Sequence, residues 1–146
     1  MMSDEISSTR HGTCQPRFLK LDRKSDDRGD LVISEFSALP FFPKRFFVQS
    51  VSAKDTSRGN HAHKRCEQIL VPISGRVDVD VLYCGGTASF ELEKKDFGLY
   101  LPAYTWSVQK NFSVNAKVLV LASEPYDEAD YVRDLIEFTE LLKDHT

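Results

Sequence analysis

The sequence predicts an all-β fold, a sandwich or barrel, with one helix at its C-terminal end. Short apolar or alternating segments recur at intervals of roughly 8 to 12 residues, with turn-forming residues between them. One segment alternates between polar and apolar residues, and another is apolar throughout. Only the last segment of the chain has apolar residues at helical spacing.

The expected strands follow one another along the chain as Phe18–Leu21, Leu31–Phe36, Arg45–Val51, Ile69–Ile73, Val77–Tyr83, Ser89–Leu92, Leu99–Leu101 and Val118–Ala122. In Val77–Tyr83 the odd positions are apolar, so this strand should bury one face. Val118–Ala122 should be buried on both faces. Pro72 cannot donate to a strand ladder, so we expect a bulge or an edge there.

The expected helix is Glu128–Lys143. Tyr131, Leu135, Phe138 and Leu142 recur at helical spacing along it. Acidic residues at its start suit the positive end of the helix dipole, and we expect the helix to pack on the outside of the strands.

Length and composition restrict the possible classes of protein. The chain has 146 residues, of which 1–16 are expected to form a flexible tail and 17–146 a single domain. The net charge of −3 argues against a broad nucleic-acid-binding surface, and no apolar stretch is long enough for a membrane helix or a secretory signal. Cys14, Cys66 and Cys84 are expected to be reduced thiols of a cytoplasmic protein, because their number is odd and no CxxC spacing occurs.

His61 and His63 are the candidate chemical groups. In a strand, residues two apart point to the same face, so RGNHAHKRCE should place two imidazoles side by side, with Arg65 and Glu67 on that face if the strand is regular. Gly59-Asn60 suggests a turn just before them. Three interpretations remain open: a polar surface strand, a metal site of His61, His63 and Glu67, or a pair of proton carriers.

Other side chains suit an anionic, ring-shaped ligand. Arg28, Arg45 and Arg58 each adjoin a strand end or a turn, and guanidinium groups bind phosphate in a bidentate way. Tyr100 and Trp106 are candidates to line the same site, with core packing as the alternative.

Several segments together resemble the dTDP-sugar 3,4-ketoisomerases, which are cupins of nucleotide-sugar biosynthesis. They are DDRGDL, PKRFF, RGNHAHK, FGLYLP with the tryptophan, and LVLASEPYDEADYVRD, in this order over about residues 17–140. The resemblance implies a jelly-roll cupin barrel that forms a homodimer with strand exchange and needs no metal or other cofactor. It also implies a substrate of the dTDP-4-keto-6-deoxyglucose type, for 3-amino-3,6-dideoxyhexoses of lipopolysaccharide O-antigens or S-layer glycans.

The resemblance also implies roles for individual residues. His61 falls on the family's catalytic histidine, with His63 beside it, and Arg45 and Arg58 fall on arginines that contact the nucleotide and the sugar. Arg28 falls where the family varies with product stereochemistry, and an arginine there favours the axial product at carbon 4. Ser107 stands where many members carry histidine or arginine, and Phe47 where tyrosine is common.

Three functional hypotheses follow from these residues. The first is an isomerase in which His61 takes a proton from carbon 3 and returns it to carbon 4, with Arg28, His63 or a tyrosine stabilising the enediolate. No GxGxxG motif is present, which agrees with an internal redox change that needs no nicotinamide. The second is a metal-dependent cupin oxygenase, and the third is a non-catalytic nucleotide-sugar-binding cupin, suggested by Ser107 and Phe47.

Overall fold

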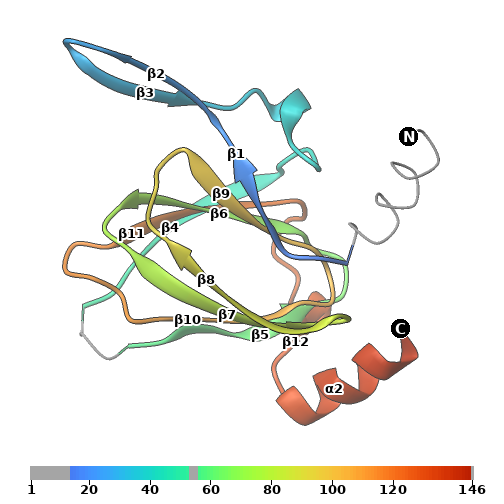
Figure 1. Ribbon diagram of the computed structural model, residues 1–146. Helices are drawn as coiled ribbons and strands as arrows, with labels where there is room; N and C mark the ends of the chain where they lie inside the picture. Colours follow the sequence, from blue (N-terminus) through green and yellow to red (C-terminus); the bar gives the residue numbers. More distant parts are fainter. Residues whose placement is uncertain (1–13, 53–55, 146) are drawn as a thin grey trace.

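The computed structural model describes residues 14–52 and 56–145 and consists mainly of two antiparallel sheets facing each other (Figure 1). The first sheet has the order β1 (Arg17–Lys20), β9 (Phe97–Leu101), β6 (Gln68–Ser74), β11 (Lys117–Ala122) and β4 (Arg45–Ser50). The second has the order β12 (Tyr131–Val132), β5 (Arg58–His63), β10 (Trp106–Lys110), β7 (Val77–Tyr83) and β8 (Gly86–Leu92). The predicted all-β jelly roll is confirmed, as two separate sheets.

The main core lies between the two sheets and follows the alternation seen in the sequence. Val77, Val79 and Val81 of β7 are buried, as predicted, and pack with Val118 and Val120 of β11. The apolar β11 differs from the prediction, because only this face is fully buried. Its other face is half-buried and packs in a second cluster with residues of β6 and β9, so the prediction of burial on both faces is wrong.

Pro72 lies in β6, in the middle of the first sheet. The pairing of β11 with β6 shifts register between Lys117 and Val118, and Val118 is the partner of Pro72. The predicted irregularity is therefore confirmed as a bulge, in an interior strand. Strand β9 pairs with β6 only over Gln68–Leu70, so the missing N–H of Pro72 interrupts no bond on that side.

The C-terminal helix is shorter than predicted. Helix α2 spans Leu135–Asp144, whereas the preceding residues form a 3-10 turn, η2 (Glu128–Asp130), and strand β12. Asp134 begins the helix because its side chain accepts hydrogen bonds from the amides of Ile136 and Glu137. Pairing of β12 with β5 excludes the earlier start. As predicted, α2 packs on the outside of the strands.

Phe138 anchors α2 to the second sheet. It is fully buried against Ala62, Trp106 and Val132. Among the described residues, no helix combines the length and the apolar character that spanning a bilayer requires.

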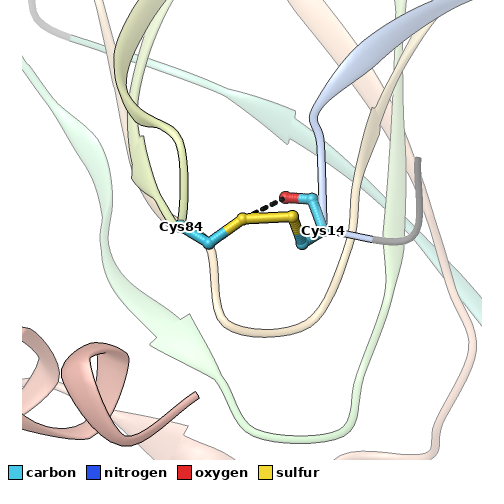
Figure 2. Close-up of a disulfide and its surroundings, with 2 residues drawn as sticks. All are labelled: Cys14 and Cys84. Carbon is cyan, nitrogen blue, oxygen red and sulfur yellow. Dashed lines mark hydrogen bonds between the residues drawn. A yellow bond between two sulfur atoms is a disulfide. The ribbon is translucent and has the colours of Figure 1, made fainter. Parts of the chain in front are cut away.

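The expectation of three reduced cysteines is wrong for two of them. Cys14 and Cys84 form a disulfide that ties the chain before β1 to the turn between β7 and β8 (Figure 2). The fold brings these residues, 70 positions apart, to a Cα–Cα distance of 6.5 Å, which cysteine count and spacing did not indicate. Cys66 remains a buried free thiol. Of the expected tail, residues 1–13 lie outside the described residues.

A hairpin projects from the body of the molecule (Figure 1). It consists of β2 (Asp22–Asp26) and β3 (Gly29–Ile33), and a 3-10 turn, η1 (Phe36–Ala38), follows it. The DDRGD segment therefore forms the tip of a hairpin, with Arg28 at the turn. Strand β2 was not predicted, because every one of its residues is polar and exposed.

Candidate functional site

The backbone of β5 carries a bulge just before His61. Ser107 of β10 is the partner of His61 while Val108 is the partner of Gly59, so Asn60 is the extra residue. Gly59 and Asn60 have positive φ values of 88° and 58°. A Cβ at Gly59 would lie 2.8 Å from the carbonyl oxygen of Ser107, so only glycine fits. The expected Gly59-Asn60 turn is therefore a bulge within a strand.

The two histidines of β5 share one face, as predicted. Their ring centroids are 5.0 Å apart, and the rings are nearly perpendicular. Their environments differ: His61 is half-buried and lines a cavity, whereas His63 is buried with 6% exposure and lies behind it. Both rings pack against Tyr131, at centroid distances of 4.9 and 4.3 Å. Strand β5 ends at His63, so Arg65 and Glu67 do not continue this face.

Hydrogen bonding determines which nitrogen of His61 is free. Nδ1 lies 2.9 Å from the carbonyl oxygen of Gly59, which can only accept, so Nδ1 donates. Nε2 then holds the lone pair of the neutral ring. Burial lowers the pKa of His61 below its usual value, and the nearby Arg133 adds to this, although the Gly59 bond opposes it. At neutral pH, His61 is therefore a neutral imidazole able to accept a proton at Nε2.

His63 is held by a buried carboxylate. Its Nδ1 lies 2.9 Å from Oδ2 of Asp130, a residue of η2 with 2% exposure. Burial lowers the pKa of His63 to about 4, because the effect of burial is larger than the opposing effect of Asp130. His63 is therefore neutral near pH 7 and donates from Nδ1.

The cavity in front of His61 has a volume of about 330 Å³ and opens between the two sheets. Its walls are strands β4, β5, β6, β10, β11 and β12, which contribute Phe47, Gln49, Arg58, Gly59, His61, Gln68, Ser107, Gln109, Val120 and Tyr131; Ser57 and Arg133 also line it. Within the described residues, Oε1 of Gln49 and of the buried Gln109 have no hydrogen-bond partner. Buried polar atoms in this condition are rare in folded proteins and suit contacts with a polar ligand.

Three of the expected substrate-binding residues lie at or near this cavity. Arg58 and Ser107 line it directly. Arg45 lies at the start of β4, where its guanidinium is 5.4 Å from the ring centroid of the cavity residue Phe47. Its Nε donates to the carbonyl oxygen of Glu124 at 3.0 Å.

The other two, Tyr100 and Trp106, and the expected catalytic residue Arg28 lie elsewhere in the fold. Arg28 is at the hairpin tip, where its side chain is 88% exposed and paired with Asp26. Trp106 is a core residue that packs against Phe138. Tyr100 donates a hydrogen bond to Glu67, and both line a second cavity of about 340 Å³, next to the Cys14–Cys84 disulfide.

The hydrogen bond from Tyr100 to Glu67 also keeps Glu67 apart from the other residues of the expected metal site. Glu67 is bonded to Tyr100 and does not line the cavity of His61, so His61, His63 and Glu67 do not form a three-ligand set. Among the described residues, the possible ligand cluster is His63, Cys66 and Asp130, whose ligand atoms lie within 4.8 Å of one another. The carboxylate of Asp130 already accepts hydrogen bonds from His63 and from the amides of Arg65 and Cys66.

Sequence reasoning missed Tyr131 and Arg133. Both residues lie within the predicted helix, but β12 places Tyr131 opposite His63, and the guanidinium of Arg133 lies 4.3 Å from the Tyr131 ring centroid. Arg133 also forms two hydrogen bonds with Glu128. The available signal was the DEADYVRD segment itself, which combines acidic, aromatic and basic residues before the cap at Asp134.

Comparison with known proteins identifies this arrangement. Residues 14–143 match the family described as "FdtA: WxcM-like, C-terminal", which is nearly the whole chain. The chain belongs to the FdtA family. A relative from Aneurinibacillus thermoaerophilus, TDP-4-oxo-6-deoxy-alpha-D-glucose-3,4-oxoisomerase, is 36% identical over 77% of this chain and 82% of its own.

Solved structures of similar fold carry the same activity in their names. QdtA, a sugar 3,4-ketoisomerase from Thermoanaerobacterium thermosaccharolyticum crystallised with TDP, superposes with a TM-score of 0.85 at 30% identity, covering 89% of this chain and 96% of its own. WlaRB, a TDP-quinovose 3,4-ketoisomerase from Campylobacter jejuni, gives 0.81 at 37% identity, covering 86% and 98%. This FdtA family member is thus an isomerase of the 3,4-ketoisomerase class.

Proposed function

We propose that this chain is a dTDP-4-keto-6-deoxyglucose 3,4-ketoisomerase that moves the ketone from carbon 4 to carbon 3. The observation that carries the proposal is the position of His61. Its ring lines a polar cavity, and Nε2 of that ring carries the lone pair because Nδ1 donates to Gly59. The relatives supply the substrate class. One is named for this oxoisomerase reaction, and QdtA has been crystallised as a histidine-to-asparagine variant with TDP-4-keto-6-deoxyglucose.

The reaction needs two proton transfers at carbon and two at oxygen. Nε2 of His61 takes the proton from carbon 3, and the electrons of that bond form the enediolate as the carbon 4 ketone becomes an oxyanion. The hydroxyl proton at O3 is lost and O4 gains one, and His61 returns its proton to carbon 4. Oxidation of carbon 3 balances reduction of carbon 4, so no external electron acceptor takes part. A positioned imidazole contributes about 10²- to 10⁴-fold to such a rate.

The walls of the cavity suit the rest of the ligand. Arg58 and Arg133 line it and Arg45 lies beside it, so the diphosphate would meet several guanidinium groups. Gln49, Gln68, Gln109 and Ser107 offer uncharged polar groups for the sugar hydroxyls and the developing enediolate. These contacts would hold carbon 3 against His61.

His63 and Arg28 do not line the cavity of the single chain. We propose that His63 acts from behind His61. For Arg28, we propose a homodimer in which the projecting hairpin of one copy serves the other. The exposed apolar side chains Leu31, Phe36 and Phe42, on and just after this hairpin, support such an association. The hairpin points away from β5 and β12 in its own chain (Figure 1).

The proposed cellular role follows from the product. A 3-keto-6-deoxy sugar nucleotide is a substrate for amination at carbon 3, which would supply 3-amino-3,6-dideoxyhexoses for lipopolysaccharide O-antigens. We propose that the reaction takes place in the cytoplasm.

The test is incubation of the protein with dTDP-4-keto-6-deoxyglucose in deuterated water, followed by NMR of the sugar. We expect the 3-keto product with deuterium only at carbon 4, deuterium only at carbon 3 of any recovered substrate, and one configuration at carbon 4, which also tests whether Arg28 and Ser107 give the axial product. Unchanged substrate despite binding of dTDP, measured as a raised Tm, would contradict an isomerase and favour a binding protein.

A further inference from the structure

Asp130 links the 3-10 turn η2 to His63 and to the loop that follows β5. Its side chain is buried and accepts three hydrogen bonds: from Nδ1 of His63 at 2.9 Å, from the amide of Arg65 at 2.6 Å and from the amide of Cys66 at 3.2 Å. Although burial raises its pKa, these bonds lower it more, and the net shift is downward. Asp130 is therefore an ionised carboxylate that can only accept hydrogen bonds.

The backbone around Asp130 is fixed on both sides. Its carbonyl oxygen accepts from the amide of Lys64 at 2.9 Å, and its own amide donates to the carbonyl oxygen of Asp127 at 3.0 Å. The next two residues pair with β5, with Tyr131 opposite His63. The carboxylate therefore meets His63 from a position that η2 and β12 determine together.

This geometry selects one form of His63. Because the ionised carboxylate accepts, Nδ1 must carry the hydrogen, and Nε2 of the neutral ring carries the lone pair. This buried Nε2 has no hydrogen-bond partner within the part of the chain that the structure describes. Without Asp130, the ring would be free to take the other tautomer or to rotate.

We propose that Asp130 is a positioning residue of the isomerase, which fixes the orientation and the Nδ1–H tautomer of the buried His63 ring against which the His61 ring packs. This proposal rests on the proposed function. When His61 accepts a proton from the sugar it becomes a cation, and a second cation at a ring distance of 5.0 Å would oppose that step. The neutral form of His63, which burial favours, adds no second charge beside His61.

The test compares Asp130→Asn with Asp127→Asn. The amide introduced by Asp130→Asn can present either an oxygen or an N–H to His63, so it no longer selects a tautomer. Asp127 is a matched control because it is an exposed carboxylate of the same segment, bonded to Arg65 and to the amide of Ala129. We expect kcat of Asp130→Asn to fall about 10²-fold or more with little change in KM, and Asp127→Asn to remain within about twofold of wild type.

A spectroscopic measurement separates positioning from a purely structural role. In ¹H–¹⁵N spectra of the histidine rings at neutral pH, His63 of the wild-type protein should show a protonated Nδ1 and an unprotonated Nε2. Asp130→Asn should lose this single pattern while the backbone amide spectrum stays folded. A wild-type His63 that is protonated at Nε2, or a folded Asp130→Asn with unchanged kcat, would overturn the proposal.

A second variant covers the case in which Asp130→Asn does not fold. His63→Asn keeps an N–H group near the place of Nδ1, so it can still donate to Asp130, but it lacks a ring nitrogen at the Nε2 position. We expect it to retain far more activity than His61→Asn. Equal loss in both would mean that His63 transfers protons itself, which overturns a positioning role. A wild-type protein with the expected tautomer and no isomerase activity would instead overturn the proposed function.

Discussion

Two cavities of similar volume lie at the start of β6 and differ in how well their polar groups are already paired. Gln68 lines the cavity of His61, and the neighbouring Glu67 lines the cavity of Tyr100. Adjacent residues of an extended chain point to opposite faces, so these two side chains point away from each other. The carboxylate of Glu67 therefore lies apart from the histidines that it was expected to join.

The difference teaches what makes a cavity a ligand site in this protein. In the Tyr100 cavity, the phenol and Glu67 bond each other, Arg65 pairs with Asp127, and the disulfide forms part of the wall. In the His61 cavity, amide oxygens of Gln49 and Gln109 have no partner among the described residues, and Nε2 of His61 is the free nitrogen of its ring. Polar groups without partners, beside a base, favour the second cavity as the catalytic one.

The largest expected effect is on His61. His61→Asn should lower kcat by about 10³-fold because the proton carrier is lost. The matched control is His145→Ala, which removes a histidine that lines the Tyr100 cavity and stacks on Tyr104. Steady-state assays of both variants, with circular dichroism to verify folding, check this. Equal kcat values in the two variants would contradict the assignment of the cavities.

The second effect concerns the disulfide, which belongs to the Tyr100 cavity. Loss of the Cys14–Cys84 bond in Cys84→Ser should reduce the free energy of unfolding by about 4 kcal/mol, because the bond closes a long loop. The kcat of the folded variant should not change, since neither cysteine lines the His61 cavity. Denaturant titration with and without a thiol reductant measures the effect. A wild-type unfolding curve that does not change with the reductant would contradict a stabilising role for the disulfide.

The sequence predicted the strands whose apolar residues alternate or cluster, and the pair of histidines on one face. It did not predict β2, since a wholly polar strand carries no hydrophobic period, and it did not predict β10. The helix was predicted to begin too early because Tyr131 continues the apolar spacing of α2. Only the tertiary pairing of Tyr131 with His63 shows that this residue belongs to a strand.

The third effect is the pH dependence of the free energy of unfolding that the buried His63 produces. Because burial lowers its pKa from 6.5 to about 4, the unfolded chain binds its proton more readily than the folded chain between these values. The contribution of neutral His63 to stability is therefore complete above pH 6.5 and is lost as the pH falls toward 4, by about 3 kcal/mol. Denaturant titrations across this range should show a weaker pH dependence for His63→Asn than for wild type. Parallel curves for His63→Asn and wild type would contradict this.

The smallest effect is at the rim of the His61 cavity. Arg58→Ala should raise KM for the sugar nucleotide about tenfold with little change in kcat, since a guanidinium contact to the diphosphate contributes to binding before the chemical step. Arg65→Ala, at the Tyr100 cavity, is the control. Initial rates over a range of substrate concentrations separate the two constants, and a larger KM for Arg65→Ala than for Arg58→Ala would reverse the comparison.

The candidate site could be predicted only in part, because some of its contacts join segments that are far apart in the chain. His61 and His63 lie on one face of one strand, as predicted, and Arg58 lies on the same strand, because strand geometry relates residues that are close in sequence. Tyr100 and Trp106 were assigned by residue type alone, and type does not tell which way a side chain points. Burial of Trp106 against Phe138 and the bond from Tyr100 to Glu67 depend on segments far apart in the chain.

The most direct measurement is a crystal structure of His61→Asn with dTDP-4-keto-6-deoxyglucose bound. The sugar ring should lie in the polar cavity, with carbon 3 within about 3.5 Å of the side chain at position 61 and the diphosphate toward Arg58. A sugar bound beside Tyr100 and Glu67, or with carbon 3 turned away from position 61, would contradict the account.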